Sequence, residues 1–199
     1  AILGDDSGCN SSAQRREDSQ RSMTVIYPVP EMFPDPRARF IQIMNTCSAL
    51  AEAGVKVILL SGAYSKYSDD DILEFYGIRR HTNLKIVRLP MLRRENAKFL
   101  RLSWHGIFHL SLLLYLFIKK RKEKNPALFV RHIKLADFLL KFRRAMNIPI
   151  IFEAHEIFHL TGTRKRLKTM EYRVMKDADA VICISEALKQ YIAGIRKDQ

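Results

Sequence analysis

The chain has 199 residues, which is enough for one sizeable hydrophobic core but too short for two full α/β domains. Hydrophobic residues make up 47% and charged residues 28%, a balance that excludes a globally disordered or fibrous protein. The formal net charge of +13 favours partners that carry negative charge, such as anionic lipid, nucleotide sugars or nucleic acid.

The number and spacing of the cysteines indicate the cellular compartment. Cys9, Cys47 and Cys183 are an odd number at wide separations, which suits neither a disulfide framework nor a CxxC metal site. We therefore expect a reducing, cytoplasmic location, and we expect neither a metal nor a cofactor. Residues 1–22 are rich in Ser, Gln, Asp and Arg and lack a signal-type apolar stretch, so we expect a disordered leader or tag before a folded domain at 23–199.

The first elements form a strand–helix–strand unit. A β-branched and aromatic run at 24–27 predicts a buried strand. Asp35 as N-cap and Pro36 at the first helical position then predict a helix that continues with apolar residues at helical spacing to Gly54. The run at 55–60 holds one charge and predicts a strand covered on both faces.

The rest of the chain continues this alternation of strands and helices, which predicts a single Rossmann-like doubly wound parallel sheet of the α/β class. The strand at 84–89 alternates in polarity and is expected near an edge. Further strands are expected at 128–130, 149–152 and 180–184. Helices are expected at about 70–76, 96–122 and 135–146, followed by a helix that ends at about 176 and a last helix capped by Ser185.

One helical segment has two interpretations. Residues 102–118 are almost uncharged and are flanked by basic residues, as in a membrane span. However, His105, Gly106 and His109 interrupt the apolar run, and a crossover helix is needed here to join parallel strands. We therefore favour a buried crossover helix.

Polar side chains follow two of the predicted strands, at the sheet edge where ligands of open α/β sheets bind. After the fifth strand come Glu153, His155 and Glu156. The imidazole can donate a hydrogen bond to a sugar hydroxyl or a phosphate oxygen, while a neighbouring carboxylate fixes its tautomer. The alternative is that these side chains only satisfy polar groups of the strand and loop.

Other residues are candidates for the same cleft, and each also has a purely structural interpretation. Arg131 and His132 follow the fourth strand and are positioned to meet an anionic acceptor, or they form a solvated loop pair. Ser185 offers a hydroxyl to an acceptor or simply caps a helix. Arg37 and Arg39, near the start of the first helix, face an acceptor phosphate or only solvate that helix.

Basic clusters near the long helix and in a later loop predict contact with an anionic membrane surface, the alternative being an ordinary solvated face. The residues are Arg93, Arg94, Lys98, Arg101, Lys119, Lys120, Arg121, Lys122, Arg164, Lys165 and Arg166.

Three stretches in order carry a resemblance to a known family. ALAEAGVKV at 49–57 is a helix-to-strand passage, IIFEAHE at 150–156 is a strand-end histidine segment, and DADAVICISEAL at 177–188 closes the domain. Together they resemble the N-terminal, acceptor-binding half of family 4 GT-B glycosyltransferases over nearly all of 23–199.

This resemblance implies that His155 is catalytic, in a cleft facing a nucleotide sugar. It implies a retaining transfer of a sugar to a polysaccharide or lipid-linked acceptor, in bacterial cell-envelope synthesis, with the enzyme at most peripheral at the inner face of the plasma membrane. The family's E-x7-E donor motif is missing, and the first loop reads PVPEMFP at 28–34 where the family has a glycine pair. The resemblance therefore implies that the C-terminal donor-binding domain is absent and that the chain is inactive alone.

Other function classes compete with this resemblance. A non-catalytic basic α/β module that binds anionic lipid or glycan stays open. Nucleic acid is not expected as a partner, because no zinc-finger spacing, RRM-type aromatic signature or helix-turn-helix unit is present. A nucleotide-dependent oxidoreductase is disfavoured because no GxGxxG follows the first strand.

Overall fold

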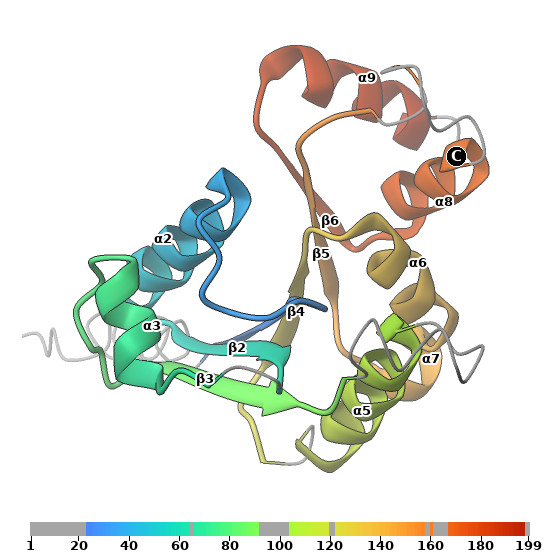
Figure 1. Ribbon diagram of the computed structural model, residues 1–199. Helices are drawn as coiled ribbons and strands as arrows, with labels where there is room; N and C mark the ends of the chain where they lie inside the picture. Colours follow the sequence, from blue (N-terminus) through green and yellow to red (C-terminus); the bar gives the residue numbers. More distant parts are fainter. Residues whose placement is uncertain are drawn as a thin grey trace, which may run out of the picture.

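The computed structural model describes residues 23–63, 66–91, 104–119, 122–157, 160 and 167–197. Six strands form one parallel sheet: β1 (Thr24–Pro28), β2 (Lys56–Gly62), β3 (Leu84–Leu89), β4 (Pro126–Val130), β5 (Ile150–Ala154) and β6 (Ala180–Cys183). Their order is β3-β2-β1-β4-β5-β6 (Figure 1). This confirms the predicted doubly wound sheet and the expected edge position of β3, whereas the expected leader at 1–22 lies outside the described residues.

The centre of the sheet is the point where the winding direction changes. Val25 of β1 pairs with Val57 of β2 on one side and with Ala127 of β4 on the other. The chain moves outward from β1 through β2 to β3, and then returns to β4 and continues the other way. In such sheets a crevice opens beyond the carboxyl ends of the two diverging strands, which here are β1 and β4.

Helices cover both faces of the sheet. One layer contains α2 (Ala38–Glu52) and α3 (Asp69–Phe75), and the other contains α5 (Trp104–Lys119), α6 (Ile133–Lys141), α7 (Arg143–Met146), α8 (Lys168–Asp177) and α9 (Glu186–Lys197). Successive strand residues serve opposite layers, because Val25 and Tyr27 pack with α2 whereas Ile26 packs with α5 and α6.

The start of α2 differs from the prediction. The helix begins at Ala38 with Arg37 at the N-cap, so the prediction of Asp35 as N-cap was wrong. The Asp35 carboxylate instead accepts hydrogen bonds from the backbone N and the Nε of Arg37, at 3.0 and 2.7 Å. The Tyr76 hydroxyl also bonds the backbone N and O of Asp35, at 2.7 and 2.8 Å, and this fixes the loop before the helix. The predicted end of the helix is confirmed, because Gly54 has a φ of +86°.

The predicted helix at 135–146 is two helices. α6 starts earlier, at Ile133, because His132 at the N-cap accepts a hydrogen bond from the backbone N of Leu135. The chain kinks at Phe142, whose φ is −105°, and the second helix ends at Asn147 in the left-handed region, with φ 48°.

The crossover helix α5 joins β3 to β4 as predicted, but it is buried on one side only. Phe108 and Leu112 are fully buried against the sheet, whereas Leu110 and Leu114 are 69% and 62% exposed. Among the described helices, none combines the length and apolar character needed to cross a membrane.

Candidate functional site

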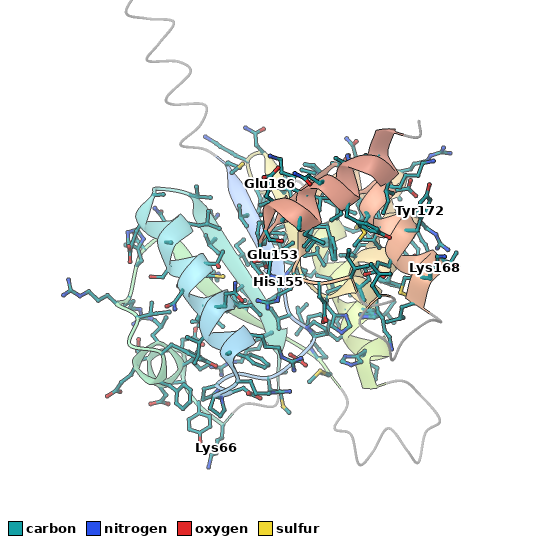
Figure 2. All side chains as sticks on the ribbon, turned by 90° about the horizontal axis from the view of Figure 1, so that it is seen from above. Lys66, Glu153, His155, Lys168, Tyr172 and Glu186 are labelled. Carbon is teal, nitrogen blue, oxygen red and sulfur yellow. The ribbon has the colours of Figure 1, made fainter. Side chains whose placement is uncertain are left out.

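A cavity of about 360 Å³ opens at the carboxyl ends of β1, β4 and β5, at the switch point of the sheet. The first turns of α2 and α6 and the loop after β1 complete its walls. Viewed from above, Glu153 and His155 lie in the middle of the molecule between the helix layers (Figure 2). The lining residues are Tyr27, Pro28, Val29, Pro30, Glu31, Arg39, Ile43, Arg131, His132, Ile133, Lys134, Phe152, Glu153, His155 and Glu156.

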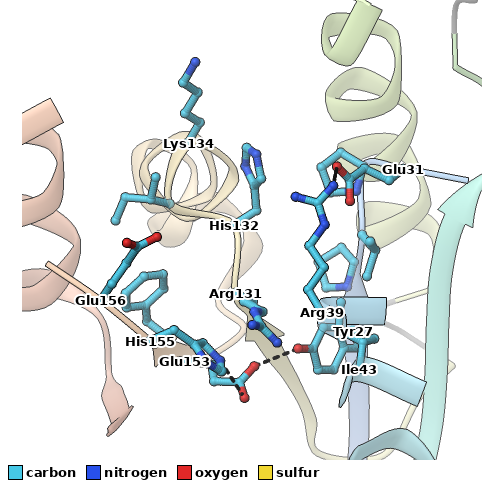
Figure 3. A pocket seen from close by; sticks show the side chains of 15 residues that line it. Tyr27, Glu31, Arg39, Ile43, Arg131, His132, Lys134, Glu153, His155 and Glu156 are labelled. Atoms are coloured by element: carbon cyan, nitrogen blue, oxygen red, sulfur yellow. Dashed lines mark hydrogen bonds and ion pairs between the residues drawn. The ribbon is translucent and has the colours of Figure 1, made fainter. Parts of the chain in front are cut away.

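Three side chains form a linked array at the base of this pocket. The Tyr27 hydroxyl donates a 2.8 Å hydrogen bond to Glu153 Oε2, and His155 Nε2 lies 3.0 Å from Glu153 Oε1 (Figure 3). Glu153 is buried, with 7% of its surface exposed, so the Tyr27 hydroxyl takes the place of water at its Oε2. Glu153 therefore connects β1 to the histidine that follows β5.

The phenol of Tyr27 stays protonated across the ordinary pH range. Burial raises the pKa of Tyr27 well above its usual value of 10, and the negative charge of Glu153 raises it further. Tyr27 is therefore a permanent hydrogen-bond donor to the carboxylate. Its ring packs 5.0 Å from the ring of Phe129 on β4, which fixes its orientation.

The imidazole of His155 lies close to the carboxylate of Glu153. Its Nε2 is within ion-pair distance of the carboxylate but forms no hydrogen bond with it. The side chain is 17% exposed, at the pocket surface. A ligand polar group that enters here meets an imidazole already restrained by a carboxylate.

The opposite wall of the pocket is basic. Arg39 forms an ion pair with Glu31, and Arg131 donates a 2.9 Å hydrogen bond to Gln42 Oε1. Burial raises the pKa of Glu31, while the positive charge of Arg39 acts in the opposite direction. Lys134 adds another cation at the rim near His132 (Figure 3). The arginines are thus oriented by neutral or acidic partners while they face the cavity.

His132 lines the pocket as a neutral group. Its pKa is lowered from 6.5 to about 4, chiefly by burial and also by the neighbouring His105, His109, Lys134 and Arg39. Its Nδ1 is occupied by the helix cap described above. At neutral pH, His132 therefore offers hydrogen bonding but no charge.

The loop after β1 has little capacity to bind phosphate through its backbone. Pro28 and Pro30 have no N–H, the N–H of Val29 bonds the carbonyl of Leu60 at 2.8 Å, and that of Glu31 bonds the carbonyl of Val29 at 2.7 Å. The loop is anchored on β2, because the N–H of Gly62 donates to the carbonyl of Glu31 at 2.9 Å. The backbone of residues 28–31 therefore offers no free N–H to an anionic group in this pocket.

Most of the predicted site residues meet in the pocket, but two do not. Arg37 is 57% exposed, pairs with Asp35 at 2.5 Å and lies outside the lining of this pocket. Ser185 also lies outside the lining and accepts a 3.3 Å hydrogen bond from the N of Leu188, which confirms its interpretation as a helix cap. The six that line the pocket are Arg39, Arg131, His132, Glu153, His155 and Glu156.

Sequence reasoning missed Tyr27, Glu31 and Lys134. Tyr27 was assigned to a buried strand, and only its place near the strand end hinted at a polar role for its hydroxyl. Glu31 and Lys134 sit in a proline-rich loop and a first helical turn, where exposed charges are ordinary. The feature of the sequence that could have indicated Glu31 and Lys134 is that they lie close to the ends of β1 and β4.

Only two residues of the predicted membrane surface are described. Lys119 ends α5 and Lys122 follows it, with Lys122 exposed. The other members lie outside the described residues: Arg93, Arg94, Lys98, Arg101, Lys120, Arg121, Arg164, Lys165 and Arg166.

Comparison with solved structures shows a shared fold at low sequence identity. Sucrose-phosphate synthase from Thermosynechococcus elongatus aligns over 86% of this chain and 45% of its own, with 15% identity and a TM-score of 0.59. Anabaena HepE in complex with UDP aligns over 87% of this chain and 40% of its own, with 9% identity and a TM-score of 0.53. The chain thus spans less than half the length of these proteins.

A further HepE structure, in complex with UDP-glucose, aligns over 86% of this chain and 40% of its own, with 9% identity and a TM-score of 0.52. No curated protein matches the chain significantly. The sequence model of Glycosyltransferase Family 4 matches residues 41–198, which is most of the chain. The fold is that of one half of a GT-B glycosyltransferase, as the sequence motifs predicted, and the chain belongs to glycosyltransferase family 4.

Proposed function

We propose that this domain is the acceptor side of an enzyme that moves a sugar from a nucleotide sugar to a polysaccharide or lipid-linked acceptor. The observation that carries the proposal is the Tyr27–Glu153–His155 array at the base of a pocket placed at the switch point of the sheet. Family membership supports glycosyl transfer, and the HepE complexes with UDP and UDP-glucose support a nucleotide sugar as partner.

His155 is the residue to which we assign contact with the transferred sugar. Its imidazole can donate to or accept from a sugar hydroxyl, and the strength of that bond rises if charge develops on the sugar or the leaving phosphate. Glu153 is the positioning residue, because it restrains the imidazole and is itself held by Tyr27. Glu156 also lines the pocket, and we assign it contact with acceptor hydroxyls.

Arg39 and Arg131 are the side chains of the pocket to which we assign the binding of an anionic group. Both are arginines, whose planar guanidinium groups bind phosphate or carboxylate through paired hydrogen bonds. The N–H groups of residues 28–31 are absent or already bonded, so in that stretch no backbone donor competes with these side chains for an anionic acceptor. A lipid-linked acceptor, in which phosphate adjoins a sugar, has the matching chemistry.

We propose that the donor is held mainly by a second domain. The chain spans 45% and 40% of the proteins with which it shares its fold, and its sequence has no E-x7-E donor motif in the expected context. Alone, the domain presents one wall of a two-walled cleft. We therefore expect no measurable sugar transfer from the isolated chain.

The test is a transfer assay with the complete gene product. The coding sequence beyond Gln199 is read, the whole protein is made, and radiolabelled nucleotide sugars are offered with polysaccharide and lipid-linked acceptors. Transfer by the whole protein and none by the isolated chain is the expected result. A stop codon directly after Gln199, together with no transfer by any partner-supplemented mixture, would point to a non-catalytic binding module instead.

A further inference from the structure

Helix α5 carries an apolar stripe that the described chain leaves uncovered. Leu110, Leu114 and Ile118 are 69%, 62% and 56% exposed and recur every four residues, so they lie on one face of the helix, and Phe117 beside them is 44% exposed. These four residues are called the α5 stripe below. A contiguous apolar surface rather than scattered single residues marks a place where something binds.

The sheet does not need these residues for packing. The core contacts of α5 come from the opposite face, where Phe108, Leu112 and Leu116 are 0, 0 and 1% exposed. Figure 1 shows α5 on the outside of the fold. The helix is thus apolar on both sides although the sheet covers only one, which is unusual for a surface helix of a globular protein.

The charge around the stripe is positive. Residues 104–124 contain a single acidic residue, Glu123, whose side chain is 9% exposed and pairs with Lys56 at 2.6 Å. Lys119 closes the helix, and Lys122 and Lys124 follow it on the exposed turn. An apolar strip that ends in uncompensated lysines matches the surface of an anionic bilayer, where acyl chains lie beneath negative head groups.

Two other occupants fit this surface less well. A second copy of the chain also carries a formal charge of +13, so like charges oppose its approach. A donor-binding domain is expected across the pocket at the carboxyl ends of the strands. α5 runs from the carboxyl end of β3 to the amino end of β4, so Lys119 and the end of the stripe lie at the far edge of the sheet.

We propose that the α5 stripe and its flanking lysines form a membrane-docking face that lies flat on an anionic bilayer. From Leu110 to Ile118 the stripe is only about 12 Å long, which allows shallow insertion and excludes a span. The first turn of the same helix approaches the pocket, because the His105 and His132 rings are 5.8 Å apart and His132 lines the pocket. Docking would therefore hold the pocket close to the head-group layer.

This inference extends the proposed function, in which the acceptor is lipid-linked. Its test uses no sugar donor, so either proposal can fail without the other. The chain is mixed with vesicles of phosphatidylcholine alone, or of phosphatidylcholine and phosphatidylglycerol in equal amounts, and the bound fraction is measured by flotation. Binding to the anionic vesicles is expected, weakening as salt is added. No binding, or equal binding to both vesicles, overturns the proposal.

Two double variants locate the surface. Leu110→Gln with Leu114→Gln should lower the vesicle partition coefficient at least tenfold, because both side chains leave the acyl region. Lys119→Gln with Lys122→Gln should lower it about fivefold for each lysine. Both pairs are exposed enough for the fold to survive, which circular dichroism verifies.

The matched control is Ile41→Gln with Phe75→Gln, which removes residues that are 43% and 52% exposed on α2 and α3 in the other helix layer. This control should bind vesicles like the unchanged chain. Equal losses in control and stripe variants would refute a specific face. If the chain does not bind vesicles but forms a dimer in sedimentation, and the Leu110 and Leu114 substitutions abolish that dimer, then a second copy covers the stripe.

Discussion

The hydroxyl of Tyr27 at the end of β1 donates a 2.8 Å hydrogen bond to Glu153 at the end of β5, 126 residues further along the chain. β4 lies between these two strands in the sheet, so the bond reaches across the switch point. It joins the two halves of the sheet beneath the pocket. A buried carboxylate is thereby fixed beside His155.

Tyr27→Phe tests this link. The substitution keeps the ring packed but leaves Glu153 Oε2 without its donor, so the free energy of unfolding should fall by about 1–3 kcal/mol. Urea denaturation measures the change. Tyr172→Phe on α8, where the tyrosine is 43% exposed, is the control and should stay within about 0.5 kcal/mol. Equal stability of the two variants would mean that the bond to Glu153 contributes nothing.

Two glycines should respond with opposite signs to the same substitution. Gly54 has a φ of +86° and open space where a Cβ would lie, so Gly54→Ala introduces only backbone strain and should destabilise by about 1 kcal/mol. Gly194 lies inside α9, also with open space, and Gly194→Ala should stabilise by about 0.5–1 kcal/mol. Chemical denaturation gives both values. Two changes of the same sign would contradict the assigned backbone conformations.

Asp179 ties the start of β5 to α7. Its Oδ2 accepts from the backbone N of Ile150 at 2.8 Å and its Oδ1 from Arg143 Nη2 at 2.6 Å. Asp179→Ala should therefore cost about 1–3 kcal/mol of unfolding free energy, measured by thermal and urea unfolding. Asp70→Ala is the control, because Asp70 and Arg80 form an ion pair with 67% and 72% of their side chains exposed. A loss at Asp179 no larger than at Asp70 would refute the structural role.

The histidines beside the pocket predict how stability depends on pH. The pKa of His132 is lowered from 6.5 to about 4, so between these values the unfolded chain binds a proton at this site and the folded chain does not. Stability therefore rises with pH across this window and is lost as the pH falls through it. His105, His109, Lys134 and Arg39 are the charged or titratable neighbours that act on His132.

His132→Asn isolates this contribution. Asparagine is a good N-cap and can still accept from the N of Leu135, but it does not titrate. The variant should lose less stability than the unchanged chain between pH 6.5 and 4.5, as measured by urea unfolding at about these two values. Identical slopes would show that His132 is not the titrating group.

The sequence predicted the sheet well because its strands are short buried runs between turn residues. Each of the six strands was placed, and β3 was placed at the edge because Lys85 and Arg88 interrupt its apolar residues. The start of α2 was misplaced because Asp35 is held by Arg37 and by Tyr76, which lies 41 residues away. Such a contact leaves no trace in local sequence pattern.

The site was predictable to the extent that it consists of strand ends. Glu153 lies near the end of β5 and His155 follows that strand, while Arg131 and His132 follow β4, and parallel strands bring their carboxyl ends to one edge. Tyr27 was not predictable as a polar partner, because its hydroxyl meets Glu153 only after the sheet has formed. The exposed stripe of α5 was also hidden, since apolar spacing does not reveal which face the sheet covers.

His155→Ala in the complete enzyme is the most direct test of the pocket as the site of sugar transfer. Steady-state kinetics with the nucleotide sugar and acceptor should show kcat reduced about 100-fold or more, with the free energy of unfolding unchanged within about 0.5 kcal/mol. His81→Ala, which removes a histidine outside the pocket lining, should leave kcat as it was. Sugar transfer by His155→Ala at the rate of the unchanged enzyme would contradict the assignment of this pocket to catalysis.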